Sequence, residues 1–483
     1  MTVVFLRFNP LVQKAFSLSY MPLIASISGI RGTIGSPPTP NLNPLEITRF
    51  TAAYGTLLQQ QGRPLKIIIG RDARPTGEMI SMIVCGTLIA MGFEIIDLGL
   101  TTTPTVELAV PAEKAAGGII ITASHNPLNW NALKLLNHLG EFISESEGEA
   151  VMEFYTNQQF KFSPATEMGN CKINNSYLDY HIQHILSLSL VNKPAIQKAG
   201  LKIVVDAVNS SGGIYVPALL KALGVKDIIE INCVPDGNFS HNPEPLKEHL
   251  GEICKRVLLE RADLGIVVDP DVDRLVFVTE EGELFGEEYT LVAVADYILS
   301  HTPGATVSNL SSTRALRDIT LNKQQKYTAT SVGEVNVVAE MKQTQAVIGG
   351  EGNGGIIYPP SHYGRDALVG IALFLSHLVT SEKKPSDLRN QYPAYFMSKQ
   401  KIELTPEMDV NFVLEEIQLK YKAQLPNTQD GVKIDFDDSW IHLRKSNTEP
   451  IIRIYTEATT QQAADNLAKD MIRMIQHMMD NTH

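Results

Sequence analysis

The chain has 483 residues, which at about 150 residues per domain predicts roughly three or four domains. Hydrophobic residues make up 44% and charged residues 19%, values that exclude a disordered chain, a collagen-like fibre and a small disulfide-stapled scaffold. The formal net charge of −12 argues against a nucleic-acid partner, although one local basic pocket can still bind a small anion.

Residues 1–20 lack the continuous apolar core and the cleavage site of a signal peptide. We expect that Met21 is the natural start or that residues 1–20 are a loosely held extension. No run of about eighteen apolar residues occurs, so no membrane partner is expected. The four cysteines show no C-x-x-C spacing, which disfavours a disulfide framework or structural zinc site and fits a reducing, cytoplasmic compartment.

Short β-branched runs alternate with helical periods in three successive passages of the chain. In the first passage we expect strands at 66–70, 94–98 and 118–122 and a helix at 78–91. In the second we expect strands at 202–206, 227–231 and 264–269 and helices near 213–223 and 245–262. In the third we expect strands at 274–278, 305–310 and 346–350 and a helix near 289–300. Such apolar strands between helices predict layered α/β domains with covered sheets.

A polar segment with two prolines, residues 381–396, is the expected linker to the last part of the chain. There we expect a strand at 399–404, a helix at 408–421, strands at 432–436, 440–444 and 451–456, and a helix at 460–479. The predicted fold is therefore α/β, with three similar mixed layered domains and a smaller C-terminal α+β domain.

The motif TASHNP (122–127) places Ser124 directly after the strand expected at 118–122. The carboxyl end of such a strand is where α/β proteins place reactive groups. The G-x-S-x-G elbow of an acyl hydrolase is absent. Because a serine in a turn commonly serves only the hydrogen bonds of the loop, Ser124 alone leaves both interpretations open.

The motif DPDVDR (269–274) places Asp269, Asp271 and Asp273 directly after the apolar run LGIVV. Packing three like charges beside a buried strand is costly unless a cation neutralises them. Oxygen ligands favour Mg²⁺ over Zn²⁺. An EF-hand loop is the rival, since Glu280 stands at its twelfth position, but Arg274 occupies the sixth, where glycine is needed. A magnesium site is therefore favoured.

A third motif, RKSNTEP (444–450), lies between two expected strands of the last domain. The donors of Arg444, Ser446, Asn447 and Thr448 suit a tetrahedral phosphate, and a polar hairpin turn is the alternative.

Two glycine-rich loops complete the set of motifs. GGEGNGG (349–355) offers Glu351 and Asn353, a carboxylate and an amide that bind hydroxyls, and is not placed as a dinucleotide-binding motif. SGIRG (28–32) sets Arg31 between glycines that let a ligand approach the backbone, or is a surface loop. Lys134 stands ten residues after Ser124, near enough in sequence to meet a phosphoryl oxygen.

In this order the motifs resemble those of the α-D-phosphohexomutase superfamily, which includes phosphoglucomutase, phosphomannomutase and phosphoglucosamine mutase. The resemblance covers residues 21 to about 480 and implies four domains around one central cleft. The implied domains and loops are 21–165 with the phosphoserine loop, 166–275 with the metal loop, 276–385 with the sugar loop and 386–483 with the phosphate loop.

The resemblance implies a mutase that interconverts hexose 6-phosphate and hexose 1-phosphate through a phosphoserine and a bisphosphate. Ser124 would carry the phosphoryl group and, with the three aspartates, hold one Mg²⁺ per active site. Catalytic roles fall to Lys134, Arg31 and His125, the last as a shaper of the phosphoserine loop. The implied substrate-binding residues are Arg274, Glu351, Asn353, Arg444, Ser446, Asn447 and Thr448. A sugar 1,6-bisphosphate is the expected activator, and the expected partner is a phosphosugar bound by a monomer or homodimer.

One position departs from the commoner pattern of the superfamily. Many relatives carry a histidine, a proposed proton acceptor, where this chain has Gly355, so Lys134, Arg31 or His362 would have to serve, and we favour Lys134.

The GEGNGG form of the sugar loop bears on the substrate, because it resembles the archaeal-type phosphoglucosamine mutases. Glucosamine 6-phosphate is therefore the favoured substrate, with Glu351 beside its ammonium, and mannose and glucose phosphates are the alternatives. A Mg²⁺-dependent phosphatase that uses Ser124 is a more distant alternative. A non-catalytic sugar-phosphate sensor is disfavoured because it would need neither the serine nor the aspartates.

Overall fold

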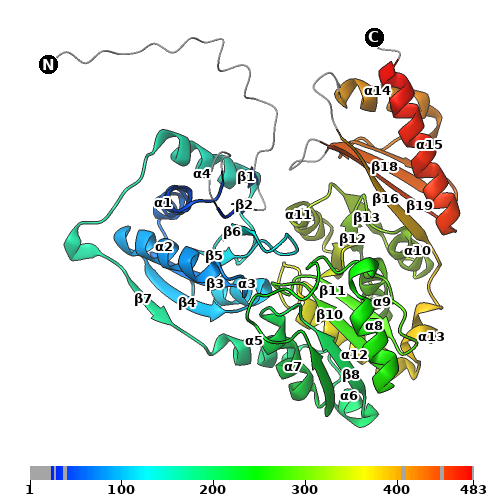
Figure 1. Cartoon of the computed structure of the whole chain (residues 1–483), viewed down its shortest axis with the longest axis horizontal. Helices are drawn as coiled ribbons and strands as arrows, with labels where there is room; N and C mark the ends of the chain where they lie inside the picture. Colours follow the sequence, from blue (N-terminus) through cyan, green and yellow to red (C-terminus); the bar gives the residue numbers. More distant parts are fainter. Residues whose placement is uncertain (1–22, 27–28, 36–40, 404–409, 446–450, 481–483) are drawn as a thin grey trace.

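The structure is a computed structural model that describes residues 23–26, 29–35, 41–403, 410–445 and 451–480. Within these residues the strands form one sheet of seven strands and three sheets of four. We call these sheets with their helices the first to fourth units, in chain order. In Figure 1 they follow an arc from the left, through the lower centre, to the upper right. The predicted fold class is confirmed, since three mixed α/β units precede a smaller antiparallel unit.

The first sheet has the strand order β1-β2-β6-β5-β3-β4-β7. Its strands are β1 (Leu23–Ser26), β2 (Gly29–Thr33), β3 (Lys66–Arg71), β4 (Glu94–Leu100), β5 (Gly117–Ile121), β6 (Trp130–Leu136) and β7 (Asn170–Ile173). Its helices are α1 (Pro44–Gln60), α2 (Gly77–Ala90), α3 (Thr103–Ala112) and α4 (Glu145–Asn157), and a 3₁₀ turn, Ala165–Glu167, precedes β7. Alternate residues of β3 belong to different hydrophobic cores. Ile67 and Ile69 pack with residues of α1 and α2, whereas Ile68 packs with residues of α3. The apolar strand is therefore covered on both faces.

The second sheet has the order β11-β10-β8-β9. Its elements are α5 (Tyr177–Ser187), α6 (Lys193–Ala199), β8 (Lys202–Asp206), α7 (Gly212–Leu223), β9 (Asp227–Ile231), a 3₁₀ turn (Lys247–His249), α8 (Gly251–Glu260), β10 (Leu264–Val268) and β11 (Leu275–Thr279). The strand expected at 274–278 was predicted to open the third passage, and this was wrong. It pairs antiparallel with β10, because the short turn over 269–274 reverses the chain at once.

The third sheet has the order β13-β12-β14-β15. Its elements are α9 (Glu287–His301), β12 (Thr306–Asn309), α10 (Arg314–Asn322), β13 (Tyr327–Thr330), α11 (Glu334–Thr344), β14 (Ile348–Glu351), β15 (Gly355–Ile357) and α12 (Ala367–Ser381). One hydrophobic core continues from the second unit into the third. Phe277 of β11 and Phe374 of α12 stack within it at a ring-centroid distance of 3.7 Å. The two units are therefore packed as one body.

The segment predicted as a linker, 381–396, is itself packed against the third unit. It contains α13 (Pro385–Arg389), in which Leu388 is fully buried. The hydroxyl of Tyr289 donates to the carbonyl of Pro393 at 2.7 Å. The polar composition and two prolines predicted a linker, but the buried side chains of Pro385, Leu388 and Tyr392 and the contact of Pro393 with Tyr289 fix the segment.

The fourth sheet has the antiparallel order β16-β19-β18-β17. Its elements are β16 (Phe396–Glu403), α14 (Val410–Lys420), a 3₁₀ turn (Lys422–Gln424), β17 (Val432–Asp435), β18 (Trp440–Lys445), β19 (Ile451–Ala458) and α15 (Gln461–Asp480). The predicted order of strands and helices is confirmed here, with ends that differ by a few residues.

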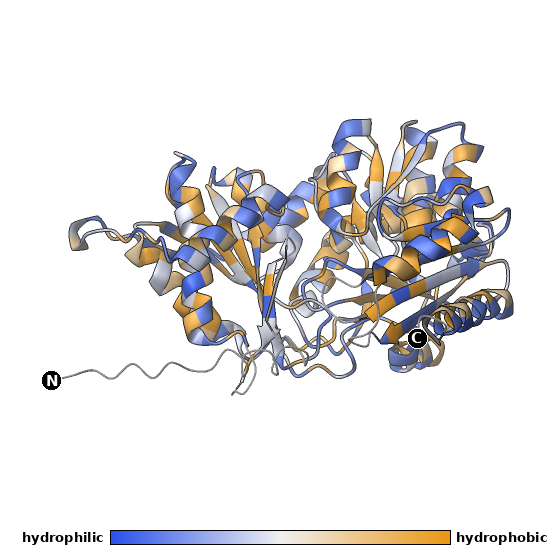
Figure 2. Cartoon of the chain, turned by 90° about the horizontal axis from the view of Figure 1, so that it is seen from above, coloured by the Kyte–Doolittle hydropathy of each residue, from blue (hydrophilic) through white to orange (hydrophobic). Residues whose placement is uncertain are grey.

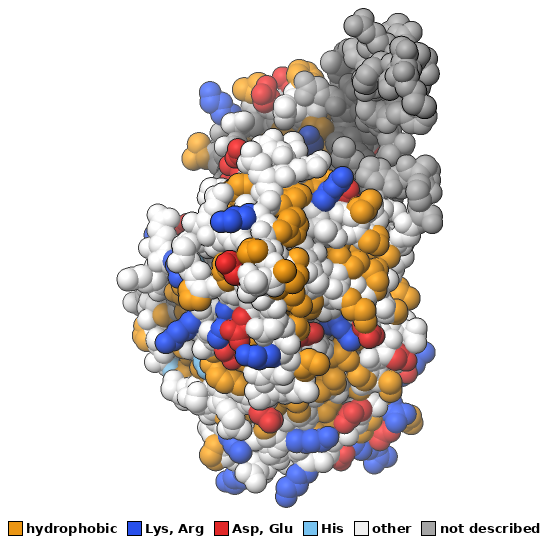
Figure 3. All heavy atoms as spheres, turned by 90° about the vertical axis from the view of Figure 1, so that its left-hand side faces the viewer, with side chains coloured by type: hydrophobic (Ala, Val, Ile, Leu, Met, Phe, Trp, Pro, Cys, Tyr) orange, Lys and Arg blue, Asp and Glu red, His pale blue; other side chains and the backbone are white. Residues whose placement is uncertain are grey.

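Hydropathy follows the layers of the molecule. In Figure 2 the hydrophobic residues lie on the strands and on the helix faces that meet them, and the hydrophilic residues lie outside. Figure 3 looks onto the side of the molecule at the left of Figure 1, where basic and acidic side chains are interspersed. Within the described residues, no helix combines the length and apolar character needed to cross a bilayer.

Candidate active site

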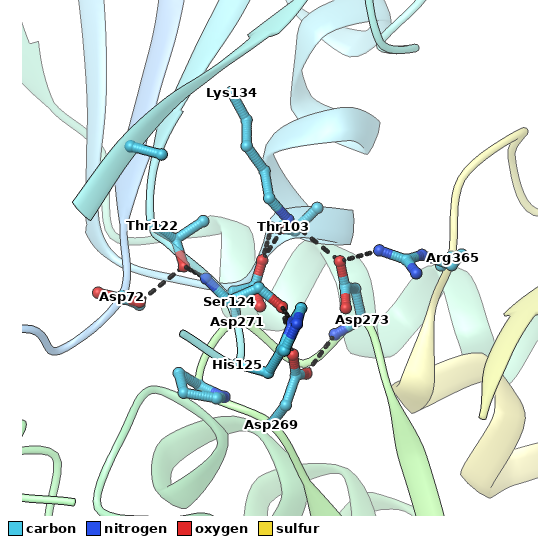
Figure 4. A network of polar contacts seen from close by, with 12 residues as sticks. Asp72, Thr103, Thr122, Ser124, His125, Lys134, Asp269, Asp271, Asp273 and Arg365 are labelled. Carbon is cyan, nitrogen blue, oxygen red and sulfur yellow. Dashed lines mark hydrogen bonds and ion pairs between the residues drawn. The ribbon is translucent and has the colours of Figure 1, made fainter. Parts of the chain in front are cut away.

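Ser124 lies in the loop after β5, with a buried side chain and a positive φ of 47°. This conformation is uncommon for a residue with a side chain. It is supported by the backbone N–H of Ser124, which donates to Thr122 Oγ1 at 2.9 Å, and Thr122 Oγ1 donates to Asp72 Oδ2 at 2.6 Å. The hydroxyl of Ser124 thereby reaches the second unit, where it donates to Asp269 Oδ2 at 2.6 Å (Figure 4).

The loop that carries Ser124 is built around the buried guanidinium of Arg74. A guanidinium has five N–H donors, and those of Arg74 meet five acceptors at 2.5–3.1 Å. The acceptors are Asp72 Oδ2 and the backbone carbonyls of Ser124, Asn126, Pro127 and Trp130. One side chain therefore sets the path of the backbone on both sides of Ser124.

The three aspartates of DPDVDR are buried at the end of β10. One carboxylate oxygen of each lies within 4.8 Å of those of the other two. Asp269 Oδ1 accepts the backbone N–H groups of Asp273 and Arg274, both at 3.1 Å, which closes the turn. Thr103 Oγ1 donates to Asp271 Oδ2 at 2.6 Å and so joins the first unit to the second.

The charges around the aspartates fit a divalent cation. Lys134 Nζ lies 2.6 Å from Asp271 Oδ2 and 3.1 Å from Asp273 Oδ2, and Arg365 Nη2 lies 2.7 Å from Asp273 Oδ2 (Figure 4). Burial and the two other carboxylates nevertheless raise the pKa of Asp269 well above its ordinary value. Among the described residues, Asp271 Oδ1 and Asp273 Oδ1 are buried without a hydrogen-bond partner. Buried acidic oxygens with unused lone pairs are ligands that a hard ion prefers, so these residues could hold a metal ion.

The predicted acid–base residues differ in their charge states. Burial would lower the pKa of Lys134, but Asp271 and Asp273 outweigh it and raise that pKa, so the amine is held as a cation. Burial and the neighbouring Arg274 lower the pKa of His125 well below its ordinary value, which keeps the imidazole neutral. His125 Nδ1 lies 3.4 Å from Ser124 Oγ.

Of the other two acid–base candidates, only Arg31 is brought to the site. Arg31, on β2, lines the cleft and donates to Asn126 Oδ1 at 3.4 Å. His362 Nε2 is 3.2 Å from Asp366 Oδ2 and its Nδ1 is 3.4 Å from Glu107 Oε2, and it does not line the cleft. The position of His362 could not be predicted from sequence, because its contact with Glu107 of α3 joins residues far apart in the chain.

A cleft of about 1200 Å³ is lined by residues of all four units. The predicted site residues that line it are Arg31, His125, Arg274, Glu351, Asn353 and Arg444. Ser124 and the three aspartates are buried next to the cleft. Their chain neighbours His125 and Arg274 form part of its lining. The motifs predicted to act together therefore do meet in space.

The sugar-loop residue Glu351 is already engaged in hydrogen bonds. Its Oε1 accepts from Asn309 Nδ2 at 2.9 Å and from the Gly333 N–H at 3.2 Å, and its Oε2 accepts from Arg365 Nη1 at 2.8 Å. The side chain of Asn353 accepts from the Gly355 N–H at 3.1 Å.

Arg365 fills the space beside Gly355. A Cβ built at Gly355 would lie only 2.3 Å from Arg365 Cδ, so a side chain at 355 and the observed position of Arg365 exclude each other. Arg365 links three carboxylates from the metal loop, the sugar loop and α11, namely those of Asp273, Glu351 and Glu334. The space beside Gly355, where the resemblance led us to expect a histidine in many relatives, is thus taken up here by Arg365.

In the fourth unit two arginines lie directly opposite each other on neighbouring strands. Arg444 of β18 pairs in register with Arg453 of β19, and both line the cleft. Like charges in this position repel, and burial together with Arg453 lowers the pKa of Arg444, although Asp430 opposes this. An anion in the cleft would relieve the repulsion. The predicted residues Ser446, Asn447 and Thr448 lie outside the described residues.

Sequence reasoning missed Arg74 and Arg365, although a signal for both was present. Each belongs to a charged cluster beside an apolar segment: GRDAR (70–74) at the end of β3, and GRD (364–366) directly before α12. Charges that follow or precede a buried run need partners. The same argument did single out DPDVDR.

Comparison with known families gives four consecutive matches. They are to "Phosphoglucomutase/phosphomannomutase, alpha/beta/alpha domain I" over residues 24–162, domain II over 179–282, domain III over 286–395, and the C-terminal domain over 401–474. Their order is that of the four sheets.

Two archaeal relatives and one solved structure illustrate the similarity. The chain is 34% identical over 458 residues to a phosphoglucomutase/phosphomannomutase of Thermococcus kodakarensis, with 93% of this chain and 98% of the relative covered. It is 32% identical to a phosphoglucosamine/phosphogalactosamine mutase of Sulfurisphaera tokodaii, with 93% and 98% covered. A crystal structure of a phosphoglucomutase/phosphomannomutase family protein from Burkholderia thailandensis superposes with a TM-score of 0.81 at 25% identity, over 94% of this chain and 96% of that one. The chain therefore belongs to the phosphoglucomutase/phosphomannomutase family of the α-D-phosphohexomutase superfamily and is an intramolecular phosphotransferase acting on hexose phosphates.

Proposed function

We propose that this enzyme interconverts glucosamine 6-phosphate and glucosamine 1-phosphate, with Ser124 as the phosphoryl carrier. The observation that carries the assignment of Ser124 is its hydroxyl, which touches Asp269 at 2.6 Å within the cluster of three buried carboxylates. A phosphate on this oxygen would add about −1.5 to −2 charges beside three acidic groups. Such a group needs a cation between them, and the unused carboxylate oxygens supply ligands for one.

The proposed reaction has two phosphoryl transfers. In the first, the P–O bond of phosphorylated Ser124 breaks and a P–O bond forms to the free hydroxyl of the hexose monophosphate, which loses its proton. In the second, the bisphosphate has turned in the cleft, and its other phosphate returns to Ser124. Asp269, Asp271 and Asp273, with Ser124, would hold one Mg²⁺, which when bound neutralises charge on the transferring oxygens. A sugar 1,6-bisphosphate would load Ser124 in an enzyme that has lost its phosphate.

We assign the acid–base roles by charge state. Arg31 and Lys134 are cations, so they act by stabilising negative charge on the phosphoryl group and in the metal loop. Lys134 is bound to two aspartates and held as a cation, so it is not the proton acceptor that the sequence favours. His125 Nδ1 lies 3.4 Å from Ser124 Oγ, but burial and Arg274 lower its pKa well below the ordinary value, which makes it a weak base. His125 is therefore assigned to positioning the loop, and the proton of the attacking hydroxyl ends on Ser124 Oγ, whose bond to phosphorus breaks.

We assign the phosphates and the sugar hydroxyls of the substrate to residues of the metal, sugar and phosphate loops. Arg444, with Ser446, Asn447 and Thr448, is proposed to hold the phosphate that does not react, and the opposed pair of Arg444 and Arg453 supports an anion there. Arg274 lies beside His125, with Nη2 3.4 Å from Nε2, where it meets the reacting phosphate. Asn353 is proposed to bind sugar hydroxyls.

The amino sugar is favoured by the acidic lining of the cleft near the sugar loop. Glu288 lines the cleft, and its Oε2 lies 2.0 Å from where a Cβ of Gly352 would stand, so it reaches the backbone of that loop. Burial raises the pKa of Glu288 to about 8. A substrate ammonium would stabilise its charged form. Glu351 is bound to Arg365 and Asn309. Glu288 accepts one hydrogen bond, from the Thr313 N–H at 2.9 Å, and lies 3.8 Å from Lys399 Nζ, so we assign the ammonium to Glu288 as the less engaged carboxylate.

The alternative is a phosphoglucomutase/phosphomannomutase, the name of the Thermococcus kodakarensis relative. One assay separates the possibilities: conversion of glucosamine, mannose and glucose 6-phosphates is followed by ³¹P NMR with Mg²⁺ and a trace of sugar bisphosphate. We expect kcat/KM for glucosamine 6-phosphate to exceed the others by about tenfold, and Glu288→Gln to remove that preference while conversion of glucose 6-phosphate persists. A greater kcat/KM for mannose or glucose phosphate would refute the proposed substrate.

The same assay tests the carrier. Ser124→Ala should abolish conversion of every sugar phosphate, and release of inorganic phosphate by the unaltered enzyme would instead favour the phosphatase. We further expect a monomer or homodimer that works in the cytoplasm without a nucleic-acid or membrane partner. Light scattering of the purified chain checks the oligomeric state.

A further inference from the structure

A second group of possible metal ligands lies away from the cleft, at the edge of the first sheet. Cys85 of α2, Asp97 of β4 and Cys171 of β7 each offer one ligand atom, and these atoms lie within 4.8 Å of one another. None of the three residues lines the cleft. In Figure 1, β4 and β7 lie side by side below α2, at the left of the molecule.

The strand register explains why these residues meet. β4 and β7 run parallel, with Ile95 opposite Cys171 and Asp97 opposite Ile173. Cys171 and Asp97 are therefore diagonal neighbours on one face of the sheet. Ile95 on that face belongs to the core that α2 covers, and Cys85 packs against the same core. Three elements thus direct one ligand each to the same point.

The geometry suits an ion bound by sulfur and oxygen. Zn²⁺ binds sulfur at about 2.3 Å in a tetrahedron, which sets two sulfurs about 3.8 Å apart, so a spacing within 4.8 Å needs only small side-chain rotations. Asp97 Oδ1 accepts the Gly99 N–H at 2.8 Å, which orients the carboxylate and leaves Oδ2 for an ion. Thiolates favour zinc over magnesium. Cys171 is exposed, so solvent reaches the group.

An ion bound at this position would have a structural role, because it would join β7 to the rest of the first sheet. All four residues of β7 are exposed, so no apolar burial holds this strand on the sheet. β7 lies in the segment that leads from α4 to α5, between the first and second units. The ion pair of Lys172 with Glu94, at 2.9 Å, is exposed and contributes little.

We propose that Cys85, Asp97 and Cys171 bind one zinc ion, with water as the fourth ligand, and that this ion fastens β7 to the first sheet. Both thiols release their protons to solvent when the ion binds. The spacing of the cysteines in the chain disfavoured a structural zinc site. In the folded chain Cys85 and Cys171 are neighbours, so the spacing no longer excludes one.

The test uses the full chain, reduced and freed of metal by a chelator, with Mg²⁺ in excess to saturate the aspartates. Titration with Co²⁺ should give a thiolate-to-cobalt absorption band that saturates at one ion per chain and disappears when Zn²⁺ is added. Cys85→Ser and Cys171→Ser should abolish the band, and Asp97→Asn should weaken binding by at least about tenfold. Cys233→Ser is the matched control and should leave both the band and the mutase activity unchanged.

Other outcomes would overturn the proposal. No thiolate band, or a band that survives in both Cys85→Ser and Cys171→Ser, would show that the ion binds elsewhere or not at all. A disulfide between Cys85 and Cys171 in the protein as isolated, seen as two missing thiols of the four in a denatured sample, would make the pair a redox group instead. If a cysteine variant fails to fold, as judged by circular dichroism, Asp97→Asn still decides, because it keeps both thiols.

Discussion

Replacing Arg74 by lysine tests whether one guanidinium sets the position of Ser124, the proposed phosphoryl carrier. Arg74 uses all five of its donors on Asp72 and on four carbonyls of the loop from Ser124 to Trp130. Lysine keeps the positive charge but has only three donors. At least two of the five acceptors must therefore lose their partner.

The size of the effect follows from these contacts. A buried acceptor left without a partner costs about 1–3 kcal/mol, so two of them would cost up to about 6 kcal/mol where water cannot replace the donor. The carbonyl of Ser124 is in a buried part of the loop, whereas that of Pro127 is near solvent, so the lower half of this range is expected. A displacement of Ser124 by about 1 Å is enough to lower kcat about 10²-fold. Arg74 does not line the cleft, so KM should change little.

The assay measures kcat and KM of Arg74→Lys for the preferred hexose phosphate, with thermal unfolding of the same sample. We expect kcat to fall about 10²-fold while KM stays within about twofold of the unaltered enzyme. Arg71→Lys is the matched control, because Arg71 lies on the same strand end and makes one weak contact, 3.4 Å to the Asp72 carbonyl. A kcat for Arg74→Lys within about threefold of the control would refute the reasoning.

Three further changes test other parts of the site. Asp269→Asn should lower kcat by at least about 10²-fold and raise the Mg²⁺ concentration needed for half-maximal rate, since it removes one of three carboxylates; an unchanged Mg²⁺ titration would exclude Asp269 as a ligand. Arg444→Ala should raise KM and increase release of the bisphosphate, measured by ³¹P NMR, whereas the exposed neighbour Lys445→Ala should not. Burial lowers the pKa of His442 to about 4 in the folded protein. As the pH falls from about 6.5, this histidine is therefore protonated in the unfolded chain before it is protonated in the folded one. The free energy of unfolding should therefore decrease between pH 6.5 and 4 by up to about 3 kcal/mol, and His442→Gln should lose that part of the pH dependence.

Strands buried on both faces could be predicted closely from sequence. The run KIVVD coincides with β8, because a β-branched run between helices has few other stable environments. DIIEI also coincides with β9, an edge strand that is only partly buried. β6 was not predicted, because its sequence WNALKLL is interrupted by two polar residues, Asn131 and Lys134, and it becomes a strand only by pairing with β2 and β5. β7 has no buried residue and hence no apolar pattern.

The residues of the site likewise fall into those that could be predicted from the sequence and those that could not. Ser124 and the aspartates were predictable because their chemistry lies within short motifs, although they come from different units and lie 145 residues apart. The charged cluster around Arg74 is visible in the sequence, but its partners were not predictable, because they are mostly backbone carbonyls about fifty residues away and a carbonyl leaves no mark in the sequence.

Arg365 shows that a residue outside a motif can fill the space that a missing side chain leaves within it. The sequence indicates that Gly355 lacks a side chain, which suggested that a proton acceptor is missing. The structure shows that the space is filled, because Arg365 lies where a Cβ of Gly355 would stand and contacts both Asp273 and Glu351. The metal loop and the sugar loop are therefore connected through one cation. Because Lys134 and Arg365 are both paired with Asp273, both stay cations, and neither can take the place of a proton acceptor at position 355.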